Sequence, residues 1–383
     1  MEVIRIDTLR MGRIKTGRNE EVLQQERNAL LSLLRMGLWK REPENLSCFP
    51  LSGSSWENLF KLARQQAVTG VVFQGLQYLP DNLLPAEALL VRWTAEVDSI
   101  ERKNRKMNAV LEELYSLFRE KGLNPVLQKG QGVARFYEHP LSRECGDIDL
   151  YFNDTHAWET ALSYLQRRHI RIKGQADDSI FYLWQEVEVE HHRRLLDLYN
   201  PFLQRFAKRL EEKHCFLFIP ASPTSETNIT VPSPFLDLLM LNLHILKHTL
   251  GRGIGLRQLC DMACACQQLH EKIDAEEMKS VCQRLGLARW SLLLHAFLVE
   301  SLGLPAACLP YPGMASSAQP LSDIVWRGGN FGQYDTGIEQ QTDGWQRKWQ
   351  TVRSFGRNIR FACHYAPKET FWFFFQLLKG QCK

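Results

Sequence analysis

The spacing of apolar residues changes twice along this chain, and this change constrains the fold more than any other feature. From Glu21 to Lys121, leucines and other apolar residues recur every three or four positions, which is typical of amphipathic helices. Between Gly122 and His191, short runs alternate polar and apolar residues, as half-buried strands do. Helical spacing returns from Phe202 onward. We therefore predict an α+β protein, in which helical N- and C-terminal regions flank a small mixed sheet.

Turns and shifts of composition divide the sequence further. The chain has 383 residues, which is more than one small core needs, so two or three domains are expected. A stretch rich in proline, serine and threonine, residues 220–234, is interpreted as a loop at a domain boundary. The expected segments are a flexible arm at 1–20, a helical region at 21–121, a sheet domain at 122–215, a helical domain at 232–304, and a loop with a helical tail at 305–383.

Individual elements follow from the same patterns. Strands are expected at residues 124–128, 147–152, 170–173, 179–184 and 187–191, with helices at 132–137 and 157–168 between them. Later helices are expected at residues 202–213, 235–249, 256–269, 275–285 and 288–302. Asn330, in the run Gly-Gly-Asn-Phe-Gly, is interpreted as part of a turn.

The overall charge sets a weak limit on function. The formal net charge is +4 and the isoelectric point is near 8.5. This mildly basic balance suits a polyanionic substrate such as a nucleotide, but a dedicated nucleic-acid binder would be more basic. The first residues lack the apolar centre of a signal peptide, and no stretch is long enough to span a membrane. We therefore expect a cytoplasmic protein without a membrane span.

Two clusters of unusual composition are interpreted as packing features. The ten cysteines lack a regular framework, and the densest group is Cys260, Cys264 and Cys266. A zinc site usually needs further paired ligands, so buried reduced thiols are the preferred interpretation. The aromatic run Phe371–Phe375 is interpreted as a packing segment, with a membrane-surface role as the alternative.

The most informative motif is Gly-Asp-Ile-Asp-Leu at residues 146–150. Because side chains alternate along a strand, Asp147 and Asp149 project from one face, while Ile148 and Leu150 point into a core. Two carboxylates held this close repel each other unless cations lie between them. Such oxygen ligands suit Mg²⁺ or Mn²⁺, which also bind substrate phosphates, and a pair of ions can assist both the attacking and the leaving oxygen.

An Asp-x-Asp motif also occurs on ordinary surface strands, so the surrounding residues matter. They resemble the DNA polymerase β-type nucleotidyltransferase superfamily and, more closely, a bacterial family of uncharacterised nucleotidyltransferases. The shared pattern covers roughly residues 60–270. It consists of Lys129-Gly130, Tyr137, Arg143, Gly146 to Leu150, Glu190, His192, Arg194-Leu195, His244 to His248, Gly255 to Arg257, and Asp261.

This resemblance implies a polymerase-β-like fold and a reaction. The chain would transfer a nucleoside monophosphate from an NTP to an acceptor, with release of pyrophosphate and with Mg²⁺ or Mn²⁺ as cofactor. Asp147, Asp149 and Glu190 would be the catalytic residues and the metal ligands. Glu188 shares its strand face with Glu190, so alternation alone does not choose between them. The family pattern favours Glu190, as a general base or as a ligand.

Nucleotide-binding residues are expected close to the first strand. Glycine allows close backbone approach and lysine supplies a point charge, so Lys129 and Gly130 are predicted to cradle phosphate. The wider superfamily has Gly-Ser here, whereas this chain has Gly130-Gln131, which puts the serine contact in doubt. Lys129 would compensate for the missing contact between serine and phosphate. Arg143 is predicted to contact the triphosphate, or to pair with a nearby acid such as Asp147 or Glu144.

The helical C-terminal domain is predicted to supply further cations. Lys247 and His248 lie on an otherwise apolar helical segment, where charged groups need a polar partner. The resemblance implies that this domain closes over the nucleotide, so both residues are predicted to contact the triphosphate.

Two other functions are considered. A nucleotide-sugar transferase can use Asp-x-Asp to hold its metal, but that class normally has a larger parallel sheet upstream, where this chain is helical. A non-catalytic module that binds a nucleotide or a protein is the other alternative, because Gln131 replaces the usual serine. The acceptor stays open between a small molecule, a sugar, a protein side chain and a nucleic-acid end.

Overall fold

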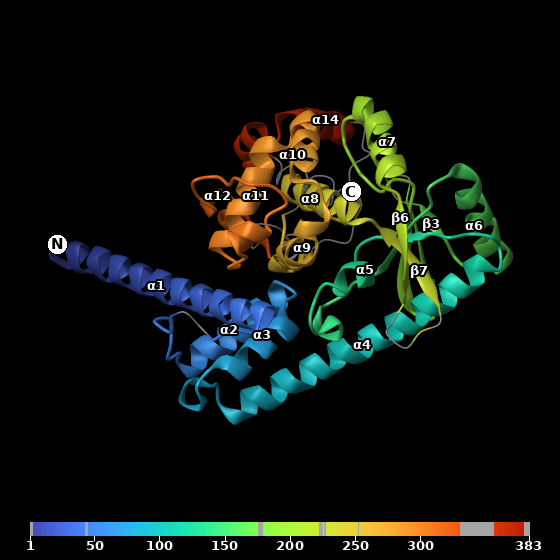
Figure 1. Ribbon diagram of the computed structural model, residues 1–383. Coiled ribbons are helices and arrows are strands. Elements are labelled where there is room, and N and C mark those ends of the chain that lie inside the picture. The colour runs from blue at the N-terminus through green and yellow to red at the C-terminus, as the bar shows by residue number, and fades with distance from the viewer. Residues whose placement is uncertain are drawn as a thin grey trace. The chain divides into compact units, whose positions relative to one another are not determined.

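The computed structural model describes residues 3–42, 45–174, 179–221, 225, 227–251, 253–329 and 356–378 (Figure 1). The chain divides into two compact units, residues 1–99 and 100–383. The sequence-based division at residue 121 falls inside the second of these units.

The first unit is helical, as the sequence predicted. It contains α1 (Val3–Trp39), α2 (Gly53–Gln65), α3 (Thr69–Gly75) and the start of α4 (Glu87–Arg119). Helix α2 is capped by Ser52, whose hydroxyl accepts a hydrogen bond from the Ser55 backbone N–H. Residues 3–20 were expected to form a flexible arm. In the structure they are helical, as the first part of α1, which begins at Val3. No proline interrupts this segment, and its Arg, Leu, Met and Lys residues favour helix.

The second unit contains one mixed sheet. Seven strands of the described residues form it, in the order β3-β4-β5-β2-β1-β7-β6. Strands β2 and β5 pair in parallel, as do β1 and β7, and the other neighbours are antiparallel. The strands are β1 (Val126–Leu127), β2 (Ile148–Tyr151), β3 (Lys173–Gly174), β4 (Ile180–Trp184), β5 (Val187–His192), β6 (Phe216–Pro220) and β7 (Asn228–Pro232).

One face of this sheet carries the hydrophobic core. Helices α4 and α6 (Thr155–Arg167) contribute residues such as Phe118 and Trp158 to that core. Ile148 and Leu150 of β2 are buried in the same cluster, so the predicted alternation along this strand is confirmed. Asp149 and Tyr151 consequently project from the opposite face.

Two strands were missing from the sequence-based assignment. β6 was not predicted, and β7 lies inside the stretch 220–234 that was interpreted as a loop. The β-branched run Ile229, Thr230 and Val231 favours a strand, but the surrounding prolines and serines masked that signal. Because β7 pairs with β1, the sheet extends past residue 215, where the sequence placed the end of its domain.

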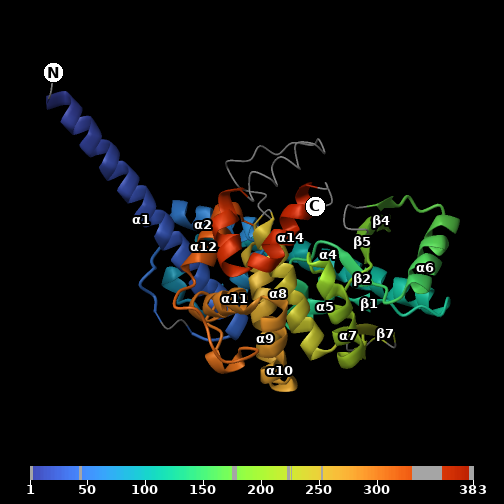
Figure 2. The same cartoon turned by 90° about the horizontal axis from the view of Figure 1, so that it is seen from above.

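Helices complete the second unit. Helices α8, α9, α10 and α11 pack together (Figure 2), and residues 356–365 are also helical. The helices are α5 (Gln131–Ala134), α7 (Gln204–His214), α8 (Pro234–Leu250), α9 (Leu256–Leu269), α10 (Ala275–Leu285), α11 (Ala288–Glu300), α12 (Gln319–Gly328) and α14 (Pro367–Leu378). The predicted class, a small mixed sheet flanked by helical N- and C-terminal regions, is confirmed.

The cysteine cluster and the aromatic run both lie in the second unit. Cys260, Cys264 and Cys266 are buried free thiols. In the aromatic run, Phe373 is buried against Tyr199, at 4.9 Å between ring centroids, whereas its aromatic neighbours are partly or largely exposed. Asn330 lies outside the described residues. None of the helices in the described ranges is both long enough and apolar enough to cross a membrane.

Candidate functional site

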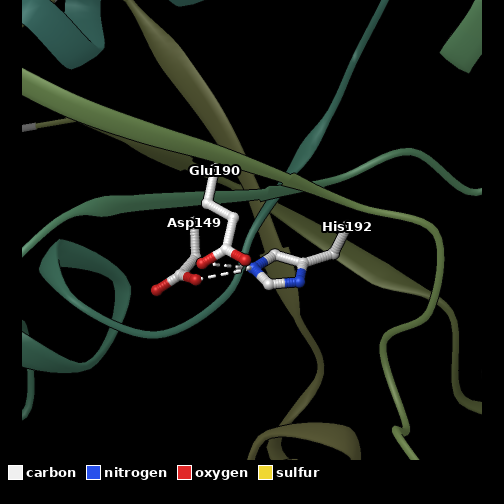
Figure 3. A group of neighbouring side chains, drawn as sticks. All are labelled: Asp149, Glu190 and His192. Carbon is white, nitrogen blue, oxygen red and sulfur yellow. Dashed lines mark hydrogen bonds and ion pairs between the residues drawn. The ribbon is translucent and has the colours of Figure 1, made fainter. Parts of the chain in front are cut away.

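The parallel pairing of β2 and β5 brings the predicted acids together. Asp149 lies opposite Glu190 in the register of the two strands, and Tyr151 lies opposite His192. Alternation places Asp149, Glu190 and His192 on one face, opposite the hydrophobic core. One ligand atom from each of these three side chains lies within 4.8 Å of the others (Figure 3).

Hydrogen bonds hold this group in place. His192 Nε2 lies 2.7 Å from Asp149 Oδ1 and 3.8 Å from Glu190 Oε2. On the other side of the glutamate, the buried Ser179 hydroxyl donates to Glu190 Oε1 at 2.7 Å. The exposed fractions of Asp149 and Glu190 are only 3% and 7%. Both carboxylates are therefore fixed in position and largely shielded from solvent.

Glu188, the alternative to Glu190, does not reach this group. It is exposed on β5, opposite Leu183 of β4. The geometry therefore favours Glu190 over Glu188 as the partner of Asp149.

Lys129 supplies the nearest positive charge. It follows β1, and its Nζ lies 2.9 Å from Asp149 Oδ1. Burial alone would lower the pKa of Lys129, but Asp149, Glu190 and Asp147 together raise it well above its usual range. Burial alone would likewise raise the pKa of Asp149, yet Lys129 and His192 hold it well below its usual range. Lys129 and Asp149 are therefore both charged at neutral pH.

Asp147 lies just before β2 and is half-buried. The charge of Asp149, followed by burial, raises the pKa of Asp147 to about 6, although Lys129 acts in the opposite direction. This carboxyl is thus close enough to Asp149 to feel its charge strongly. Repulsion of this kind is relieved when a cation lies between two acids.

Gly130 forms the turn that presses against Asp147. Its backbone has φ 54° and ψ −121°, a conformation that side chains other than glycine rarely adopt. A Cβ atom at this position would lie 2.8 Å from the backbone oxygen of Asp147. The turn after β1 therefore requires glycine, because the backbone of Asp147 lies so close to it. Gln131, at the usual serine position, donates to Asn104 Oδ1 of α4 at 3.4 Å.

Arg143 has a structural partner that the sequence did not suggest. Its Nε and Nη2 atoms each lie 2.7 Å from a different carboxylate oxygen of Asp261 on α9. The Tyr137 hydroxyl donates to the same carboxylate at 2.8 Å. Arg143 is buried, and desolvation works against its charge, but Asp261 keeps its pKa well above the usual value. This pair ties the loop before β2 to α9.

Lys247 and His248 lie on α8 and are half-buried. Lys247 forms an ion pair with Asp197, and His248 packs edge-on against His244, at 4.4 Å between ring centroids. Burial lowers the pKa of His244 strongly, and smaller effects come from His248, Lys129 and Asp149. His244 is thus close enough to Asp149 to feel the charge of that acid.

Sequence reasoning left two groups out of the predicted site. His192 belongs to the shared family pattern but was given no role at the site, although it shares the alternating face of β5 with Glu190. Its neighbour His191 points to the core, where it contacts the Tyr182 hydroxyl at 2.8 Å. Ser179 could not have been found, because its bond to Glu190 depends on how β4 pairs with β5.

This donor set fits a divalent cation. Two buried carboxylates and one imidazole converge, a third carboxyl lies next to them, and oxygen donors are in the majority, which favours Mg²⁺ or Mn²⁺. The chain belongs to the uncharacterised nucleotidyltransferase family, whose family model matches residues 52–303. The predicted resemblance to this family is thereby confirmed. No curated protein and no solved structure matches the chain.

Proposed function

We propose that this chain transfers a nucleoside monophosphate from an NTP to an acceptor, with pyrophosphate as the second product. The observation that carries the proposal is the register of β2 and β5, which sets Asp149 directly opposite Glu190 beside His192. Membership of a nucleotidyltransferase family supports the reaction class.

Asp147, Asp149 and Glu190 would hold the metal ions, with His192 as a further ligand. Two bound Mg²⁺ or Mn²⁺ ions would offset the charge of the triphosphate and stabilise the attacking and leaving oxygens. Glu190 also suits the role of general base. Ser179 donates a hydrogen bond to its Oε1 atom, which fixes the carboxylate that would take the proton of the attacking group.

Lys129 would bind the triphosphate. In the structure its ammonium group lies 2.9 Å from Asp149 and offsets the charge of that acid. Once bound metal ions offset this charge instead, the ammonium group of Lys129 would be available to bind phosphate. The backbone at Gly130 would allow phosphate to approach closely. Lys247 and His248 are proposed to add cations from α8, with His244 beside them. Arg143 would act through Asp261, by holding the loop that precedes Asp147.

A nucleotide-sugar transferase is less well supported. That class is expected to bind its nucleotide on a large parallel sheet, whereas only two strand pairs are parallel among the described residues. A non-catalytic nucleotide-binding module differs from our proposal in activity alone, so an activity measurement separates the two.

The test is metal-dependent release of pyrophosphate from each of the four common NTPs, in the presence of a cell extract that supplies acceptors. We expect release that requires Mg²⁺ or Mn²⁺. Loss of a general base typically slows a reaction about a hundredfold or more, so Glu190→Gln should reduce the rate to that extent. The matched control is Glu188→Gln on the same strand, which should retain the rate. Equal rates in the two variants would refute the assignment of Glu190.

A further inference from the structure

A cavity of about 310 Å³ opens where β2 and β5 end. Tyr151 and Phe152 line it from the end of β2, Arg193 and Arg194 from the residues after β5, and Lys208 from α7. These are the carboxyl ends of two parallel strands, and ligands of α/β sheets commonly bind at such ends.

The cavity begins close to the proposed transfer site. Tyr151 follows Asp149 by two residues on β2, projects from the same face, and lies opposite His192 in the strand register. At roughly 3.3 Å per residue, the wall formed by Tyr151 lies about 7 Å along the strand from Asp149. A molecule held in the cavity could therefore present a reactive group to the acids.

The mouth of the cavity offers positive charge. Arg193 and Arg194 are both exposed. The guanidinium of Arg193 lies over the ring of Trp158, at 4.7 Å from its centroid, which keeps the group in place while its N–H edges remain accessible. Within the described ranges, no acidic side chain forms an ion pair with Arg193 or Arg194.

The acids that line the cavity are already engaged. Asp154 caps α6, since its Oδ1 accepts a hydrogen bond from the Ala157 backbone N–H at 2.7 Å. Glu211 accepts a hydrogen bond from the Tyr151 hydroxyl at 2.6 Å, and Lys208 lies 3.2 Å from the same oxygen. The two arginines therefore give the mouth a net attraction for anions.

We propose that this cavity binds a phosphorylated small molecule, and that this molecule is the acceptor of the nucleotidyl group. The planar guanidinium fork matches phosphate geometry, and the volume lies at the lower end of the range for small-molecule sites, which is roughly 300–1,000 Å³.

The inference rests on the proposed function for its chemistry. A hydroxyl oxygen of the acceptor attacks the α-phosphorus of the NTP and forms the new P–O bond. The bond from that phosphorus to the oxygen that bridges to the β-phosphate breaks, so pyrophosphate leaves. The hydroxyl proton passes to the carboxylate of Glu190, which acts as the general base.

Calorimetric titration of the full chain with inorganic phosphate tests the anion site. The chain is first titrated to saturation with Mg²⁺ and a non-hydrolysable NTP analogue. This first titration tests the proposed nucleotide binding separately from the phosphate site. We then expect phosphate to bind the wild type, and Arg193→Ala/Arg194→Ala to bind it about tenfold more weakly or worse, as the loss of charge-assisted hydrogen bonds requires. Arg209→Ala, which removes an exposed charge of α7 outside the cavity, should bind phosphate like the wild type. Equal phosphate affinity in the double variant and the wild type would overturn the site.

A second experiment tests the identity of the acceptor. A low-molecular-weight cell extract is divided, one half is treated with a phosphatase that is then removed by filtration, and both halves are incubated with the chain and an NTP labelled at its α-phosphate. We expect labelled small-molecule product from the untreated half only. Equal labelling of both halves would overturn the proposal that the acceptor is phosphorylated.

Discussion

Replacing Gly130 by alanine should damage both stability and the site, because two costs coincide there. The backbone at Gly130 has φ 54°, which alanine rarely adopts. The added Cβ would also lie 2.8 Å from the backbone oxygen of Asp147, closer than real Cβ atoms approach. Since a backbone oxygen cannot rotate away, either the turn after β1 or the start of β2 must shift.

Gly122 provides a matched control for this substitution. It has φ 70°, so alanine is strained there too, but no atom lies within 4 Å of the added Cβ. Gly122→Ala should therefore cost about 1 kcal/mol, from backbone strain alone. Gly130→Ala adds an overpacking cost of about 1–3 kcal/mol, so its total cost is about 2–4 kcal/mol. The less flexible unfolded chain offsets a small part of the cost in both variants.

The two variants are compared by thermal unfolding and by calorimetric titration with NTP and Mg²⁺. We expect Gly130→Ala to melt at a lower temperature than Gly122→Ala and to bind NTP about tenfold more weakly, because Lys129 and Asp147 adjoin the shifted turn. Gly122→Ala should bind NTP like the wild type. If both variants melt at the same temperature and bind NTP equally well, the contact between Gly130 and Asp147 neither limits stability nor shapes the nucleotide site.

Three further predictions concern other parts of the second unit. Arg143→Ala leaves Asp261 buried without its main counter-charge, so denaturant unfolding should show a loss of about 3 kcal/mol or more; a loss below 1 kcal/mol would contradict this. Burial raises the pKa of Glu369 to about 7, so its folded state retains a proton that an unfolded glutamate releases near pH 4.3. Stability from this group is therefore complete below about pH 4 and declines by about 3 kcal/mol as pH rises to about 7, a slope that Glu369→Gln should flatten in unfolding measured across that range. Lys247→Ala should weaken NTP binding at nearly unchanged melting temperature, whereas Asp197→Asn should leave NTP binding as strong or stronger. If Lys247→Ala instead loses stability and keeps its NTP affinity, the ion pair between Lys247 and Asp197 is only structural.

The sequence was sufficient to predict elements whose structure depends on the local spacing of apolar residues. Ile148 and Leu150 alternate with the acids of the Asp-x-Asp motif, and the structure buries both of them, as predicted. Helix α9 was predicted with the same bounds, because apolar residues at helical spacing are bracketed there by clear turn signals.

Pairings between distant segments could not be predicted in the same way. Arg143 and Asp261 lie 118 residues apart, and only the packing of α9 against the loop before β2 brings them together. β7 was missed because its β-branched run is short and the surrounding prolines and serines have the composition of a loop. Alternation on β5 left both Glu188 and Glu190 open, and the parallel register with β2 is what sets Glu190 opposite Asp149.

The central claim is that Asp149 and Glu190 form a metal-dependent nucleotide site. Calorimetric titration of the wild type and Asp149→Asn with NTP, each with and without Mg²⁺, tests it most directly. We predict that Mg²⁺ tightens NTP binding by the wild type, and that Asp149→Asn loses most of this gain while keeping its melting temperature within a few degrees. NTP affinity that is the same with and without Mg²⁺ in the wild type would contradict the account.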